Sequence, residues 1–266
     1  MPIRSLCAAL ALISGVCAAR AAVAHDTWLL PEQFVLKTGK TVVCEMTSGT
    51  SFPRLESAIE RSRVERADLR FRGAVASLQE RRSESRALAF LLPLRGTGVA
   101  TVAVALKPRT LELTAAQVAE YLAEIGAPDA VRSAWAASPG KKWRETYRKL
   151  AKTFVRVGEA DDGGWREAMG LPFELVPDGD PTRLVQGQTL TVRLLRDGSP
   201  SAGAAVGVVR GGEAAGTLLT TDAKGRATVS FAKRGHYLLR STELRPAGAG
   251  GETWTSDFTT LTIEVR

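Results

Sequence analysis

The chain has 266 residues and a formal net charge of +8, and its hydrophobic and charged fractions of 44% and 24% are those of an ordinary globular protein. These values exclude a wholly disordered chain and a collagen-like chain, and three cysteines are too few for a disulfide scaffold. The two histidines, His25 and His236, exclude a metal or catalytic site that needs three histidines from one chain.

The first 24 residues have the pattern of a secretory signal peptide. Arg4 supplies a positive charge, a short apolar run from Leu6 to Val16 follows, and Ala22-Val23-Ala24 matches a small-residue cleavage site. The apolar run is shorter than the ~20 residues of a membrane-spanning helix, and no later stretch meets that length. We therefore expect residues 1–24 to be removed and the mature protein to be periplasmic or secreted, without a membrane span.

The sequence from His25 to about Lys107 has a strand pattern. Its apolar runs are separated by turn residues such as Gly39-Lys40, and Pro31 indicates an edge or a bend. Cys44 is the single cysteine left after removal of the leader, so the mature chain can form no intrachain disulfide. Packed apolar cores must then stabilise the fold.

The hydrophobic period becomes helical at about residues 112–157. Thr114 and Gln117 have the spacing of a capping box, and apolar residues follow at helical intervals up to Gly126. The pattern predicts a second helix across Asp129 to Ala136.

A third helix is predicted from Lys142 to about Val155. Its apolar stripe consists of Trp143, Tyr147, Leu150 and Phe154. The acidic, glycine-rich residues 158–167 that follow have the composition of a linker.

Strand patterns return from Gly170 to Arg266, with about seven short strands at a spacing typical of an immunoglobulin-like sandwich. We therefore predict a mainly β protein with two β-sandwich (Ig-like) domains and a short helical insertion between them. The N-terminal domain would span residues 25–167 and contain the helical segment, and the C-terminal domain would span residues 168–266.

Short motifs occur in a fixed order along nearly the whole mature chain. They are His25-Asp26-Thr27-Trp28 with Pro31, Arg144-Glu145 with Tyr147, Gly170-Leu171-Pro172 with Glu174, and Trp254 with Ser256-Asp257-Phe258. With these motifs the chain resembles a family of exported NikM-like, nickel-uptake-associated proteins of undefined activity. Residues 197–240 resemble the prealbumin-like or Ig-like modules of bacterial envelope proteins. The resemblance implies a periplasmic protein of transition-metal handling, with a membrane metal transporter or an outer-membrane receptor as its partner.

Cleavage after Ala24 would make His25 the first residue of the mature protein. A free N-terminal histidine presents its α-amine and ring Nδ1, and such nitrogens suit Cu(II), Ni(II) and Zn(II). If His236 approached the same ion, three nitrogens would form a histidine brace of the copper-oxygenase kind. Cleavage after Ala22 would place His25 third, in a different chelate, and cleavage after Ala21 would remove both sites.

Each candidate also has a structural interpretation. His25 can be a junction residue in solvent, and alternation with the inward-facing Tyr237 turns His236 outward. Cys44 and Met46 share one strand face and are expected in the core rather than as ligands of Cu(I). The sequence contains no nucleophile elbow, phosphate-binding loop or dinucleotide fingerprint.

The sequence therefore predicts a non-enzymatic periplasmic protein that binds nickel, cobalt or copper, with His25 and His236 as candidate ligands and no catalytic residue. Two alternatives stay open. One is a structural or interaction module of the envelope that binds no metal, and the other is a copper-dependent oxygenase built on a histidine brace. No nucleic-acid partner is expected, because the mildly basic charge is spread along the chain without interleaved aromatic residues.

Overall fold

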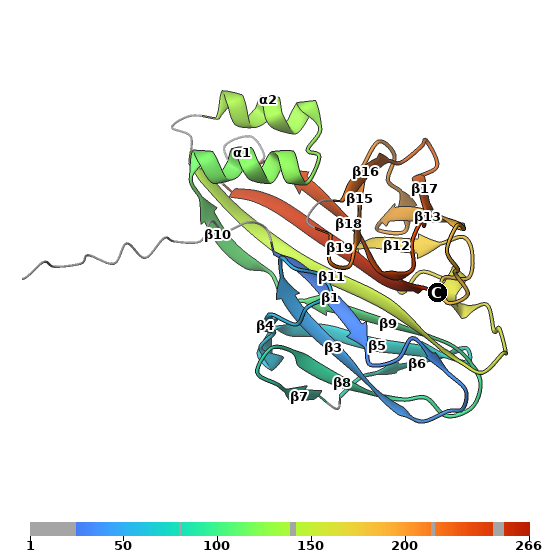
Figure 1. Ribbon diagram of the computed structural model, residues 1–266. Helices are drawn as coiled ribbons and strands as arrows, with labels where there is room; N and C mark the ends of the chain where they lie inside the picture. The colour runs from blue at the N-terminus through green and yellow to red at the C-terminus, as the bar shows by residue number, and fades with distance from the viewer. Residues whose placement is uncertain (1–24, 80, 139–141, 214–215, 247–252) are drawn as a thin grey trace, which may run out of the picture.

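The computed structural model describes residues 25–79, 81–138, 142–213, 216–246 and 253–266 (Figure 1). The predicted signal peptide and its cleavage site lie outside the described residues. The fold is mainly β, with three sheets that pack as β-sandwiches, so the predicted fold class is confirmed. No helix in the described part of the chain is both long and apolar enough to cross a membrane.

The first sheet, sheet A, is antiparallel and comes entirely from the N-terminal third of the chain. Its strand order is β1-β3-β8-β7, with β4 paired to β3. The strands are β1 (Asp26–Pro31), β3 (Thr41–Gly49), β4 (Ser57–Ala58), β7 (Arg81–Ser83) and β8 (Leu88–Pro93). A short 3-10 helix, η1 (Arg61–Arg63), leads out of this sheet.

The second sheet, sheet B, has ten strands and runs through both halves of the molecule. Its order is β16-β15-β18-β19-β11-β9-β5-β6, with β10 and β2 also paired to β11. Its N-terminal strands are β2 (Val35–Leu36), β5 (Val64–Phe71), β6 (Ala74–Ser77), β9 (Gly98–Leu106), β10 (Arg109–Leu113) and β11 (Trp143–Val157). Its C-terminal strands are β15 (Ala205–Arg210), β16 (Thr217–Thr220), β18 (Gly235–Arg245) and β19 (Thr253–Val265).

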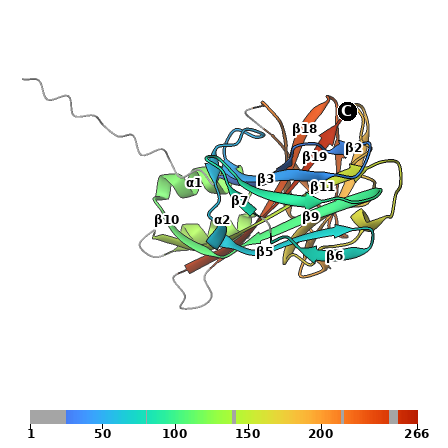
Figure 2. The ribbon, with the colours of Figure 1, turned by 90° about the horizontal axis from the view of Figure 1, so that it is seen from below.

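The two halves meet in sheet B at the parallel pairing of β11 with β19, which extends from Arg144 beside Thr253 to Thr153 beside Thr262. Seen from below, β9, β5 and β6 lie on one side of β11, and β19 and β18 lie on the other (Figure 2). The predicted domain boundary at residue 167 falls after β11, in the loop that leads to the third sheet. The division into two domains at this residue stays a prediction.

The third sheet, sheet C, packs on the C-terminal part of sheet B. It contains β12 (Phe173–Pro177), β13 (Thr189–Arg196), β14 (Ser199–Pro200) and β17 (Arg226–Ser230). One apolar core fills the space between sheets B and C, and a second fills the space between sheets A and B. Both cores draw side chains from β9 and β11, so these two strands are buried on both faces.

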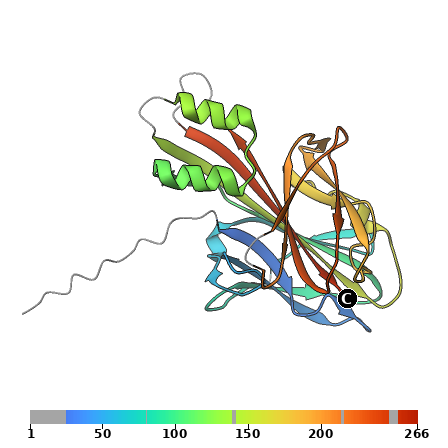
Figure 3. The same cartoon turned by 45° about the horizontal axis from the view of Figure 1, so that its top comes forward.

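The two helices, α1 (Ala115–Glu124) and α2 (Asp129–Ala137), lie together at one end of β11 and β19, away from sheet C (Figure 3). The predicted capping box of α1 is confirmed. The Thr114 side chain accepts a hydrogen bond from the Gln117 amide at 3.4 Å, and the Gln117 side chain accepts one from the Thr114 amide at 2.9 Å. The buried face of α1 packs on Trp143 and Trp254.

The predicted third helix is wrong, because Trp143–Val157 forms the 15-residue strand β11. Its even positions, such as Leu150 and Phe154, face the core between sheets B and C, whereas Ala151 and Val155 face the core between sheets A and B. A strand buried on both faces loses the polar alternation that identifies a strand in the sequence. The predicted helical segment therefore ends with α2.

Two charged side chains on the even-numbered face of β11 also made the strand hard to predict. Charges usually indicate an exposed face, but each of these two has a buried partner. Lys152 is buried against Glu174, with 2.7 Å between Nζ and Oε1. Arg156 is buried as well, and its Nε donates to the Thr182 hydroxyl at 2.8 Å, while another guanidinium nitrogen pairs with Asp180. Charges that look like a solvated face in the sequence are thus satisfied inside the protein.

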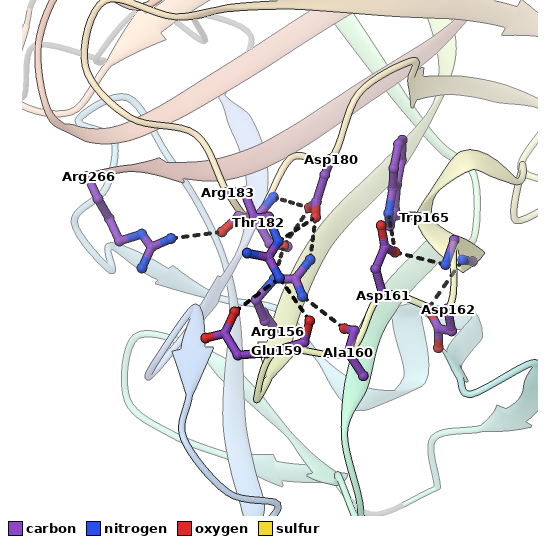
Figure 4. A network of polar contacts seen from close by, with 12 residues as sticks. Arg156, Glu159, Ala160, Asp161, Asp162, Trp165, Asp180, Thr182, Arg183 and Arg266 are labelled. Carbon is purple, nitrogen blue, oxygen red and sulfur yellow. Dashed lines mark hydrogen bonds and ion pairs between the residues drawn. The ribbon is translucent and has the colours of Figure 1, made fainter.

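The predicted linker at residues 158–167 is instead a packed loop (Figure 4). Trp165, in the 3-10 helix η3 (Gly164–Arg166), is 2% exposed, and its indole nitrogen donates to Asp161 at 2.9 Å. The Arg156 guanidinium donates to the Ala160 carbonyl at 2.9 Å. The buried tryptophan attaches the loop to the core between sheets B and C, and these hydrogen bonds hold it in place.

Candidate functional site

The structure places the two candidate histidines at opposite ends of β1. His25 directly precedes β1, and its neighbour Asp26 lies 2.6 Å from the Arg240 guanidinium. The His236 ring packs on Phe34, which follows the end of β1, with 5.2 Å between ring centroids. A six-residue strand spans ~17 Å, whereas two ligands of one metal ion lie within about 4 Å of each other. This pair therefore does not form the histidine brace considered above.

His236 is half-buried on the second residue of β18. Its Nε2 lies 3.8 Å from a carboxylate oxygen of Glu264, the paired residue on β19. The next residue, Tyr237, packs in the core against Phe231. The sequence-based prediction that Tyr237 points inward and His236 outward is thus confirmed.

His25 is exposed and lines a polar cavity of about 210 Å³ at the edge of sheets A and B. The cavity collects residues from η1 and from five strands, β3, β4, β9, β10 and β11. Besides His25, its lining residues are Ser48, Ala58, Ile59, Glu60, Arg63, Leu106, Arg109, Tyr147 and Lys149. We call it the His25 cavity.

Lys149 connects the His25 cavity to the start of β1. Its ammonium donates to the His25 carbonyl and lies 3.5 Å from the Ser48 hydroxyl, so its direct contacts here are with neutral oxygens. Burial lowers the pKa of Lys149 to about 8, against the attraction of Asp26, which raises it. Lys149 therefore holds the backbone of His25 in place, and its hydrogen bond does not involve the histidine ring.

Arg63 and Arg109 complete the cationic wall of the cavity. One Arg63 nitrogen donates to the Lys107 carbonyl at 2.9 Å, but the Arg63 Nε is buried and has no hydrogen-bond partner in the described part of the chain. Burial and the nearby Arg109 charge lower the pKa of Arg63. Arg109 pairs with the exposed Glu60 at 3.0 Å. The wall thus carries three cationic side chains and one carboxylate.

A separate charged cluster holds β1 in place behind the cavity. The Arg240 guanidinium on β18 contacts Asp26 at 2.6 Å and Glu124 of α1 at 2.9 Å. Burial raises the pKa of Asp26, although Arg240 opposes this effect. The adjoining cavities of about 20 and 10 Å³ have room for little more than a water molecule. The contacts of this cluster support a structural role, because it joins β1, β18 and α1 around very little free space.

Glu145 is a further buried carboxylate, for which the sequence predicts no role. It is fully buried beneath the helices, where it accepts hydrogen bonds from Tyr121 at 3.1 Å, from Trp143 at 2.8 Å and from Ser256. Burial raises its pKa, and the hydrogen bonds oppose the shift. No ligand-sized opening adjoins it among the described cavities, so its observed contacts support a structural role.

Cys44 and Met46 lie in the core between sheets A and B and are both 0% exposed. Burial raises the pKa of the Cys44 thiol, which keeps it protonated and unreactive. The core interpretation of these two sulfur atoms therefore agrees with their position. Within the described ranges, no group of three or more His, Cys, Asp or Glu side chains is arranged to hold a metal ion.

A family model described as a domain of unknown function, DUF4198, matches residues 22–243. The chain belongs to the DUF4198 family. This agrees with the expectation of a family of undefined function. The DUF4198 match includes sheets A and C and most of sheet B, but ends before β19. No curated protein matches this DUF4198 chain.

Solved structures resemble the DUF4198 chain only at low similarity. An α-2-macroglobulin from Escherichia coli shares 11% identity over 92% of this chain and 16% of its own length, with a TM-score of 0.21. A DUF4785 family protein from Legionella pneumophila shares 11% identity over 80% of this chain and 50% of its own, with a TM-score of 0.25. The Escherichia coli adhesin FdeC shares 14% identity over 91% of this chain and 64% of its own length, with a TM-score of 0.21. The chain thus spans less than two thirds of each of these proteins.

Proposed function

We propose that this DUF4198 protein is an exported, non-enzymatic protein that binds a transition metal ion, nickel, cobalt or copper, through His25. The observation that carries the proposal is the exposed position of His25 at the rim of the His25 cavity, immediately after the predicted cleavage site. Cleavage there would give one residue two nitrogen donors, the α-amine and ring Nδ1, that suit these metals. The proposal agrees with the NikM-like motifs of the chain.

The donor chemistry fits a metal at His25 with incomplete protein coordination. The Lys149 ammonium donates to the His25 carbonyl and so positions the residue. This contact leaves the imidazole available, together with the α-amine that cleavage would create. The other lining side chains are mostly cations or alcohols, so the remaining coordination positions would be filled by water or by a small ligand. A protein that supplies only two donor atoms suits reversible delivery of the metal to a partner. We propose that delivery takes place in the periplasm and that the partner is a membrane metal transporter or an outer-membrane receptor.

The test is a calorimetric titration of the secreted mature protein with Cu(II) and Ni(II), after mass spectrometry has established its first residue. We expect binding of one ion per chain, and loss of that binding in the His25→Ala variant. A form with one extra residue before His25 should also bind more weakly, because the α-amine is displaced. His236→Ala is the matched control and should bind like the wild type, because His236 lies at the other end of β1.

Equal binding by the wild type and His25→Ala would overturn the proposal. Complete absence of binding by a correctly processed wild type would do the same and would favour the interaction-module alternative. Reductant-driven peroxide production by the copper-loaded protein would contradict the non-enzymatic part of the proposal, and it would have to come from copper at His25 without His236.

A further inference from the structure

We propose that the His25 cavity is a binding site for a small organic acid that carries two or more carboxylates. This inference concerns the metal-free protein and does not depend on metal binding at His25. It stands on the charge of the cavity, on a buried donor without an acceptor, and on the size and composition of the walls.

The charge of the cavity is the first argument. Arg63, Arg109 and Lys149 come from three separate elements, η1, β10 and β11, and converge on one space. Glu60 is the one carboxylate among the lining residues, and it pairs with Arg109 on the exposed side. Asp26, the other acid near Lys149, already contacts Arg240. The positive charge on Arg63 and Lys149 therefore lacks a dedicated counter-charge within the cavity, and an anion would supply it.

The second argument is the Arg63 guanidinium. Its Nε has no acceptor in the ranges that the structure describes, while the same group also interacts with the Tyr147 side chain of the cavity wall. A buried donor that makes no hydrogen bond costs ~1–3 kcal/mol, and more when the group is charged. A carboxylate placed against this guanidinium can accept two parallel hydrogen bonds, the geometry that arginine forms best. A guanidinium that lines the cavity thus favours an oxygen ligand over a cation.

The third argument is the kind of molecule that the space admits. A cavity of about 210 Å³ is larger than a single inorganic anion fills. Carbon atoms of Ala58, Ile59 and Leu106 form part of the wall, and Tyr147 adds an aromatic ring. A mainly polar wall that also includes apolar side chains suits a short carbon skeleton with several carboxylates.

An organic acid in this position would also affect a neighbouring metal ion. The three cations repel a bare divalent ion at His25, and bound carboxylates would offset that repulsion. Carboxylate oxygens are themselves metal ligands. The cavity and His25 can therefore act as adjacent halves of one site, although each half can be tested alone.

The test uses calorimetry on the mature, metal-free protein with tricarballylate, a tricarboxylate that binds metals weakly, at low ionic strength. We expect one molecule bound per chain, with affinity falling at least tenfold between 50 and 500 mM NaCl. Arg63→Gln and Lys149→Gln should each weaken binding at least tenfold. Arg109→Gln should weaken it severalfold, and because Arg109 is half exposed, this variant keeps the test available if the other two fail to fold.

Arg61→Gln is the matched control, because Arg61 is an exposed arginine on the same 3-10 helix that does not line the cavity. It should bind tricarballylate like the wild type. Tricarballylate binding that is absent, or equal in all the variants, would overturn the proposal. Inorganic phosphate that binds as tightly as tricarballylate would overturn the organic-acid assignment. His25→Ala should still bind the acid, so failure of this test is distinct from failure of the metal titration.

Discussion

Glu145 shows how burial changes a single side chain in this protein. Its carboxylate receives three hydrogen bonds from neutral groups, and no cation pairs with it among the described ion pairs. Desolvation disfavours the charged form of a buried acid, so the pKa of Glu145 lies above the ordinary value of 4.5. The folded protein therefore holds a proton that the unfolded chain releases at lower pH.

This raised pKa predicts a specific pH dependence. From about pH 4.5 up to the pKa of the folded state, the unfolded chain binds fewer protons at this residue, so the stability contributed by Glu145 falls as pH rises. The Glu145→Gln variant lacks the ionisation and should lose less unfolding free energy than the wild type over this interval. Urea unfolding at a series of pH values between 4.5 and 8 measures the difference, and parallel curves for the two proteins would contradict the prediction.

The three cations of the His25 cavity could not be recognised as one group from the sequence. His25 was identified because it follows a predicted cleavage site. Arg63, Arg109 and Lys149 were not identified, because they lie in different elements and no spacing relates them. Charged residues at such positions are usually solvated, and only the convergence of η1, β10 and β11 gives them a common environment.

At the scale of elements, the sequence predicted α1 correctly and β11 wrongly. The number of buried faces explains both results. Helix α1 has one buried face and a local start signal, so its period and its cap are both visible in the sequence. Strand β11 is buried on both faces, and its charges at Lys152 and Arg156 have buried partners, so neither period is visible. Local signals identify elements that are half exposed and fail for elements at the centre of the molecule.

The capping box of α1 gives the prediction at this scale. Thr114→Ala should lower the unfolding free energy by about 1 kcal/mol, because it removes the hydroxyl that accepts the Gln117 amide hydrogen bond. Thr114→Ser keeps an oxygen in this place and is the control, with no expected loss of unfolding free energy, because serine is at least as good an N-cap as threonine. Denaturant unfolding compares the two variants, and equal stabilities would show that the cap contributes little here.

At the scale of the whole molecule, sheet B couples the two halves of the chain. The core between sheets B and C contains mainly C-terminal side chains, but Val99, Leu150 and Phe154 come from the N-terminal half. The pairing of β11 with β19 lies between these halves and continues over ten residue pairs. Separation at residue 167 would expose this shared sheet edge and part of each core.

We therefore expect one cooperative unfolding transition for the mature chain rather than one transition for each half. Scanning calorimetry should give a single peak whose calorimetric and van't Hoff enthalpies agree. The fragment 168–266, expressed alone, should lack a cooperative transition because it loses β11 and the apolar side chains of the N-terminal half. Two resolved peaks, or a cooperatively folded fragment, would support the separate domains predicted from the sequence.

The sequence by itself determined the mainly β class, the capped helix α1 and the core position of Cys44, because alternation, capping and burial preference act over a few neighbouring residues. Tertiary structure alone decided that Trp143–Val157 is a strand, that His25 and His236 lie apart, and that three cations meet beside His25. These features depend on contacts between residues far apart in the chain, and such contacts outweigh local preference once both faces of an element are buried.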